Sequence, residues 1–192
     1  LEMATKQLSM RTVCSQAQVP YSLVRKRAPL DADQWKKLTA AASFIAGLPL
    51  YFDDRPKPTI DQIRASLSAM KREVEAKGQR LQAVVIDYIQ LIRINLKNGL
   101  NLSQGIGEVT GDLKAIAKDL DLPMIALSQL SRELEKEKRA PRLSDLRDSG
   151  SIEQDADNVL FIDRHGDNAE LILAKSRNDQ PGSFSVGWDG PS

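Results

Sequence analysis

The sequence predicts an α/β protein with a mainly parallel sheet flanked by helices and with antiparallel strands at its C-terminal end. Residues 84–91 contain an apolar, β-branched run that ends in the carboxylate of Asp87, and residues 123–129 contain a second apolar run that ends in polar side chains. Both runs are typical of buried parallel strands, and helical patterns alternate with them. The antiparallel strands are expected at residues 159–162, 171–174 and 184–188.

The helices are predicted from periodic apolar positions and from capping residues. Asp31 can cap a helix that ends near Gly47. Thr59 and Gln62 form a capping box for a helix that Gly78 closes. Further helices are expected at residues 1–13, 21–27 and 106–120. A short strand is expected at residues 50–52, and a loop at residues 99–105.

Composition limits the class of protein. The chain has 192 residues, of which 41% are apolar and 28% charged, so it can form one domain with a substantial core. Its 27 basic and 26 acidic residues nearly balance, so any contact with nucleic acid must come from local patches. Cys14 and His165 are the only residues of their types, which excludes a disulfide framework and a His/Cys zinc site. No apolar run approaches the roughly 20 residues that span a bilayer, so we expect no membrane partner.

Polar side chains follow three of the predicted strands. Asp87 ends the first strand, Gln129 ends the second, and Lys175 and Arg177 follow a later one. Ligands of α/β sheets bind at the carboxyl ends of the strands, so we expect these side chains to converge on one edge. An acid can hold a metal ion, an amide can bind a phosphate, and two cations can stabilise developing negative charge. Phosphoryl transfer uses this set of groups. Each side chain could instead be a solvated strand end.

Three segments resemble the successive signature motifs of the DnaB-type replicative helicases. These segments are residues 85–91, 125–132 and 143–157, with shorter matches at residues 1–3 and 174–178. The segment around Asp87 would fit many RecA-like ATPases, whereas the long third segment is highly specific. The resemblance implies a single RecA-like P-loop NTPase core over residues 1–192 and an ATP-dependent DNA helicase that acts in replication.

The resemblance also implies a role for each matching residue of the ATP site. Glu2 matches the glutamate that polarises the attacking water as general base. Asp87 matches the Walker B acid that holds Mg²⁺, and Gln129 matches the residue that senses the γ-phosphate of ATP. Lys175 and Arg177 match a pair that reaches into the neighbouring subunit's site, with Arg177 as the arginine finger.

A further match implies a site for single-stranded DNA. Arg147, Asp148 and Gly150 match a loop that grips the phosphate backbone inside a homo-hexameric ring. A motor that moves along any sequence should hold phosphates rather than base edges. Residues 132–148 carry six basic and five acidic side chains, so most of this segment could equally be a solvated charged loop. The family also implies primase and a helicase loader as partners, and a location in the bacterial cytoplasm for a bacterial or phage protein.

One motif of the family is missing. The chain contains no Gly-x-x-x-x-Gly-Lys-Ser/Thr sequence, which forms the phosphate-binding loop of such ATPases. In the family this loop lies just upstream of the motif at residues 1–3. We therefore expect that the chain is truncated before Leu1 and that this piece alone binds ATP weakly and does not hydrolyse it. Two alternatives stay open: a RecA-like recombination or repair ATPase, and a DNA- or partner-binding module without a phosphate-binding loop.

Overall fold

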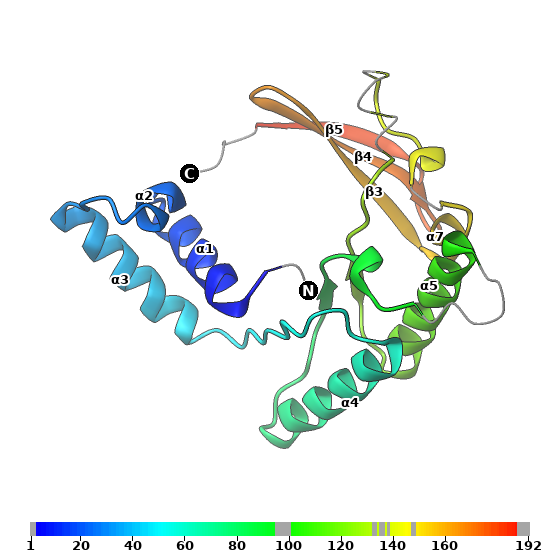
Figure 1. The fold of residues 1–192 in the computed structure, drawn as a ribbon, viewed down its shortest axis with the longest axis horizontal. Helices are drawn as coiled ribbons and strands as arrows, with labels where there is room; N and C mark the ends of the chain where they lie inside the picture. Colours follow the sequence, from blue (N-terminus) through cyan, green and yellow to red (C-terminus); the bar gives the residue numbers. More distant parts are fainter. Residues whose placement is uncertain are drawn as a thin grey trace. The chain divides into compact units, whose positions relative to one another are not determined.

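The computed structural model of the protein describes residues 3–94, 101–131, 134, 137, 139–146 and 149–187 (Figure 1). The chain divides into a helical unit at residues 3–54 and a core unit at residues 55–186. Within the described residues, no helix combines the length and the apolar character needed to cross a membrane.

Three helices form the helical unit. They are α1 (Thr5–Ala17), α2 (Tyr21–Arg25) and α3 (Ala32–Ala46). The Asp31 carboxylate accepts a hydrogen bond from the Gln34 backbone N–H at 2.7 Å, and the Gln34 side chain accepts one from the Asp31 N–H at 3.1 Å. This capping box and the C-cap at Gly47 confirm the helix predicted there. The buried side chains of the unit are Cys14, Ala17, Val19, Leu38 and Ala41.

The short strand predicted at residues 50–52 is absent, so that prediction was wrong. The apolar side chains of Leu50, Tyr51 and Phe52 are 50%, 38% and 38% exposed. Among the described residues, no strand pairs with this segment. Without a partner strand, its backbone N–H and C=O groups have no ladder to join, and an apolar pattern alone does not form a strand.

The first half of the core unit alternates helices with strands. Its elements are α4 (Ile60–Ala76), β1 (Val84–Ile86), the 3₁₀ turn η1 (Ile89–Leu91), α5 (Leu102–Asp119) and β2 (Met124–Ala126). The predicted capping box of Thr59 and Gln62 is present at the start of α4. Gly78 follows the helix with φ +71°, a left-handed conformation that glycine adopts without strain.

Helix α5 begins earlier than its apolar pattern predicts. Asn101 and Gln104 form a capping box, with both hydrogen bonds at 2.9 Å, inside the segment that was predicted to be a loop. Gly105 is buried within the helix. The loop prediction was therefore wrong from Leu102 onward, while residues 95–100 lie outside the described residues.

Strands β1 and β2 pair in parallel, as the sequence predicts. Val84 lies opposite Met124, and Ile86 lies opposite Ala126. The expectation that these strands are buried on both faces was wrong. Val85 is 63% exposed and Ile125 is 55% exposed, because alternate side chains point to the two faces and only one face packs against the core of the described residues.

The C-terminal part of the core unit is an antiparallel sheet preceded by short helices. The helices are η2 (Leu143–Asp145) and α7 (Ser149–Asp155), and the strands are β3 (Asn158–His165), β4 (Asn168–Ser176) and β5 (Gly182–Gly187). The strand order is β3-β4-β5, which confirms the predicted antiparallel addition. Asn158 lies opposite Ser176, so the end of β4 returns to the start of β3.

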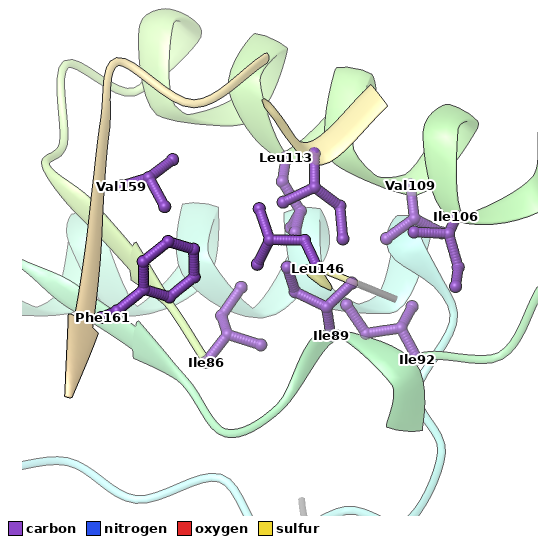
Figure 2. Close-up of a cluster of buried hydrophobic side chains, with 10 residues drawn as sticks. Ile86, Ile89, Ile92, Ile106, Val109, Leu113, Leu146, Val159 and Phe161 are labelled. Atoms are coloured by element: carbon purple, nitrogen blue, oxygen red, sulfur yellow. The ribbon is translucent and has the colours of Figure 1, made fainter. Parts of the chain in front are cut away.

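One apolar core joins the elements of the core unit (Figure 2). Helix α5 contributes Ile106, Val109 and Leu113, which pack against side chains from the other elements. The remaining members are Ile86, Ile89, Ile92, Leu146, Ile152, Val159 and Phe161. Both sheets therefore share a core with α5, although the described strands of one sheet do not pair with those of the other.

Helices α5 and α7 approach closely at Gly107. A Cβ atom added to Gly107 would lie 2.5 Å from Ser151 Oγ and 3.0 Å from Ser151 Cβ. At Gly111, one turn further along α5, the nearest atom to an added Cβ is Asp155 Oδ2 at 4.0 Å. The absence of a side chain at Gly107 is therefore what allows the two helices to pack.

We predict that alanine is less favourable at Gly107 than at Gly111. Alanine favours the helix by about 1 kcal/mol at either position. Gly107→Ala also forces α7 away, and overpacking of this kind costs about 1–3 kcal/mol. Thermal unfolding followed by circular dichroism should therefore give a lower midpoint for Gly107→Ala than for the matched control Gly111→Ala. Equal midpoints for the two variants would contradict the close approach.

Candidate functional site

Asp87 and Gln129 lie at the carboxyl edge of the parallel strand pair. Asp87 directly follows β1, and Gln129 lies three residues beyond the end of β2. The pairing continues past both strands, because the Leu127 N–H donates to the Ile86 carbonyl at 2.9 Å and the Ile89 N–H donates to the Leu127 carbonyl at 3.0 Å. Both polar residues are exposed. The structure thus brings these two strand ends to one edge, as expected from the sequence.

Gln90 connects the two strand ends. Its Nε2 donates to Ser128 Oγ at 2.9 Å, and its Oε1 accepts a longer hydrogen bond from the Gln129 N–H at 3.5 Å. Gln90 was not among the site residues predicted from the sequence. A signal was available, because Gln90 is an amide within an otherwise apolar segment three residues after Asp87.

Lys175 and Arg177 lie beside the start of β3. The Arg177 N–H donates to the Asp157 carbonyl at 3.0 Å, and Arg177 Nε lies 3.0 Å from Asp157 Oδ1. The Lys175 ammonium donates to the Glu153 carbonyl in α7. Arg177 is therefore tied to the segment that joins α7 to β3, and Lys175 is tied to α7 itself.

The start of β3 lies at the amino end of the parallel pair. Asp157 and Pro123 line the same shallow depression, together with Lys114 and Leu122. Pro123 directly precedes β2, and its carbonyl accepts the hydrogen bond from the Val84 N–H at the start of β1. Asp157 therefore lies at the edge of the parallel pair that is opposite Asp87 and Gln129.

The expectation that all these polar side chains converge on one edge was thus wrong for Lys175 and Arg177. The reason is the direction of β4. It runs antiparallel to β3, so its carboxyl end returns to the beginning of β3 at Asp157. The polar positions at this end of β4 are separated from Asp87 by the length of the strands.

Asp157 lies between two cations. Lys114 Nζ donates to Asp157 Oδ1 at 2.5 Å and to the Asp155 carbonyl at 2.9 Å, while Arg177 contacts the same carboxylate oxygen of Asp157. The hydrogen bond from Lys114 lowers the pKa of Asp157, and the nearby charges of Lys114, Arg177 and Lys175 lower it further. Asp157 thus stays ionised and holds Arg177 beside α5.

The segment predicted to contact DNA is described only in part. Arg147 and Asp148 of this segment lie outside the described residues. Glu2, the predicted general base of the ATP site, also lies outside them. Gly150 lies in α7 and is exposed, and a Cβ added there would meet no atom within 4 Å. Among the described residues, crowding therefore does not require glycine at this position.

We predict that removal of Lys114 raises the pKa of Asp157 toward its ordinary value. Lys114→Met removes the hydrogen bond that contributes most to the lowered pKa, whereas Arg177→Met removes only a weaker charge effect. An NMR titration of the Asp157 carboxyl carbon should show the larger upward shift in Lys114→Met. A larger upward shift of the Asp157 pKa in Arg177→Met would mean that Arg177, and not Lys114, contributes most to the lowered pKa.

The sequence matches one family along almost its whole length. The model of the DnaB-like helicase C terminal domain matches residues 1–191. The chain is 37% identical to the replicative DNA helicase DnaB of Geobacillus stearothermophilus over 198 residues, covering 98% of this chain and 42% of that protein. It is 39% identical to the replicative DNA helicase DnaB of Leifsonia xyli over 200 residues, covering 99% of this chain and 42% of that protein. The chain therefore spans less than half the length of these curated relatives.

Solved structures of helicases also resemble the protein. A DnaB-like replicative helicase, described with its interactions with primase, has a TM-score of 0.87 at 30% identity, with 97% of this chain and 46% of that chain covered. A second structure, of an ATPase domain, has a TM-score of 0.88 at 30% identity, with 98% of this chain and 69% of that chain covered. The parallel strand pair, the helices and the antiparallel three-stranded sheet thus form a RecA-like fold, and the chain belongs to the family of DnaB-like helicase C-terminal domains.

Proposed function

We propose that this chain is the motor of a ring-forming, ATP-driven helicase that unwinds DNA during replication. The proposal rests on the family match over residues 1–191, which coincides with two parallel strand ends that bring Asp87 and Gln129 to one edge. The curated relatives are named replicative DNA helicases. Both units of the chain belong, in this proposal, to a single motor domain over residues 1–192.

Asp87 and Gln129 are suited to bind ATP with its magnesium ion. Among the described residues, no hydrogen bond or ion pair occupies the exposed Asp87 carboxylate. Carboxylate oxygens are ligands that Mg²⁺ prefers, and a Mg²⁺ ion held there would neutralise charge on the phosphates. The Gln129 amide can donate to a γ-phosphate oxygen at the same edge. Glu2 would accept the proton of the water that attacks the γ-phosphorus.

Arg177 is proposed to act on ATP bound to the neighbouring subunit. Its position at the opposite edge from Asp87 supports this assignment, because one subunit's arginine cannot easily reach its own magnesium-binding acid. Its Nε contacts Asp157, which leaves the two terminal guanidinium nitrogens to meet a phosphate. Lys175 would assist from the same strand end, although its ammonium is also bonded to the Glu153 carbonyl.

The proposed assembly is a homo-hexamer around single-stranded DNA. Arg147, Asp148 and Gly150 would grip the phosphate backbone, and hydrolysis at each subunit interface would move these loops along the strand. Primase is a proposed partner because one similar helicase is described with its interactions with primase. A helicase loader is proposed from the family resemblance, and the site of action would be the cytoplasm of a bacterial cell.

We expect Arg177→Ala in the complete protein to lower ATP hydrolysis by about 10³-fold or more, because an arginine finger stabilises the transition state. The dissociation constant of ATP should change less than about threefold, since the ground state is bound by other groups. Arg164→Ala, near the turn at the opposite end of the β3–β4 hairpin, is the matched control and should keep full hydrolysis.

Mixed rings test whether Arg177 acts across the interface. Arg177→Ala subunits keep Asp87, and Asp87→Asn subunits keep Arg177, so each variant alone should be inactive. Rings that contain both should recover part of the hydrolysis at interfaces where an intact Arg177 meets an intact Asp87. Failure of mixed rings to recover any hydrolysis would point to action within one subunit.

We expect Arg147→Ala to weaken binding of single-stranded DNA with a smaller effect on hydrolysis in the absence of DNA. Loss of one phosphate contact should also reduce the slope of log affinity against log salt by about 0.7. Fluorescence anisotropy of a labelled oligonucleotide at several salt concentrations measures both quantities. An unchanged salt slope would argue against a phosphate contact by this arginine.

A further inference from the structure

Asp145 is a buried carboxylate, with 7% of its surface exposed. It ends the short helix η2 (Leu143–Asp145), two residues before Arg147 in the sequence. A buried carboxylate is costly unless it is paired and hydrogen-bonded. Its partners should therefore reveal why it lies there.

Three donors surround the Asp145 carboxylate. Arg139 Nη1 donates to Oδ2 at 2.6 Å and Arg139 Nη2 donates to Oδ1 at 2.7 Å, so the contact is bidentate. The Arg142 backbone N–H donates to Oδ2 at 2.7 Å. The hydrogen bonds from Arg139 lower the pKa of Asp145 to about 2, so the pair is charged throughout the physiological range. A bidentate pair of this kind fixes orientation as well as distance.

The backbone around Asp145 is joined to the end of the strand that carries Gln129. The Ser131 N–H donates to the Asp145 carbonyl at 2.8 Å, and Leu130 forms an antiparallel bridge with Leu146. Leu130 directly follows Gln129, and Leu146 directly precedes Arg147. One bridge therefore separates the proposed γ-phosphate sensor from the segment proposed to hold DNA.

The side of this bridge that faces the core is firmly packed. Leu146 is 6% exposed and belongs to the main apolar core (Figure 2). Leu130 also packs against this core. Asp145, which directly precedes Leu146, is held by its bidentate contact with Arg139. Apolar packing is non-directional, whereas the paired hydrogen bonds set the orientation of residues 139–146 relative to the strand end.

We infer that Arg139 and Asp145 are a positioning pair that transmits the state of the ATP site to the DNA-binding segment. The inference rests on the proposed function. The pair anchors Asp145, whose carbonyl accepts from the Ser131 N–H, while Leu146 bridges Leu130. We expect a displacement of Gln129 to pass through these contacts to the residues that precede Arg147. Coupling of this kind travels through contiguous, ordered contacts. Neither residue of the pair contacts ATP or DNA in this proposal.

The test compares hydrolysis of ATP with and without single-stranded oligo(dT), in the complete protein. Arg139→Lys keeps the charge but loses the bidentate contact, and Asp145→Asn keeps the shape but loses the charge. Arg139→Met with Asp145→Leu replaces the pair by apolar side chains, a change that buried ion pairs often tolerate. The matched control is Arg64→Met, which removes a half-exposed Arg–Asp contact of 2.6 Å between α4 and α5.

We expect Asp145→Asn and the double variant to lose about tenfold in stimulation of hydrolysis by DNA, while hydrolysis without DNA stays within about twofold of the parent protein. Arg139→Lys should show an intermediate loss and Arg64→Met no loss. Parallel loss of both activities in proportion to unfolded protein, measured by circular dichroism, would mean a merely structural pair and overturn the inference. Arg139→Lys and Asp145→Asn decide the question even if the double variant does not fold.

The same measurements separate this inference from the proposed function. A parent protein whose hydrolysis does not respond to oligo(dT) would refute the proposed motor itself. A parent protein that responds, together with folded pair variants that respond equally well, would refute only the role of Arg139 and Asp145.

Discussion

The packing of α5 against the strand ends is the constraint on which the core unit depends. Ile106, Val109 and Leu113 on one face of this helix lie in a core with side chains from β1, η1, α7 and β3. Burial of each such side chain contributes about 1.5–3 kcal/mol. Since parallel strands need a crossover connection, the helix that joins β1 to β2 also holds them in register. The meeting of Asp87 and Gln129 at one edge follows from this packing.

The polar face of the same helix organises the opposite edge. Thr110 Oγ1 donates to Asp155 Oδ2 at 2.5 Å, and Lys114 holds Asp157, which in turn holds Arg177. One helix thus connects a carboxyl edge suited to a nucleotide with an amino edge that carries an arginine. In the proposed hexamer, each interface would combine the carboxyl edge of one subunit with the amino edge of its neighbour.

Local features of the fold could be predicted because they depend on residues close in sequence. The capping boxes of Asp31 and Thr59 involve a partner three residues away, and the parallel strands and their crossover helix follow from apolar patterns. The strand expected at residues 50–52 failed because a strand exists only with a partner. Gln90 was missed because its importance depends on Ser128, which lies 38 residues away in the sequence and becomes a neighbour only when the strands pair.

The sequence by itself determined the family, the order of the main helices and strands, and the chemical character of each strand end. Tertiary structure alone decided which strand ends share an edge. Arg177 ends a strand as Asp87 does, yet the reversal of chain direction between β3 and β4 carries it to the opposite edge. Tertiary structure also decided that Asp145 is buried, because its partner Arg139 and its neighbour Ser131 converge only in the folded chain. Chemical identity is local, whereas proximity is set by packing and by strand direction.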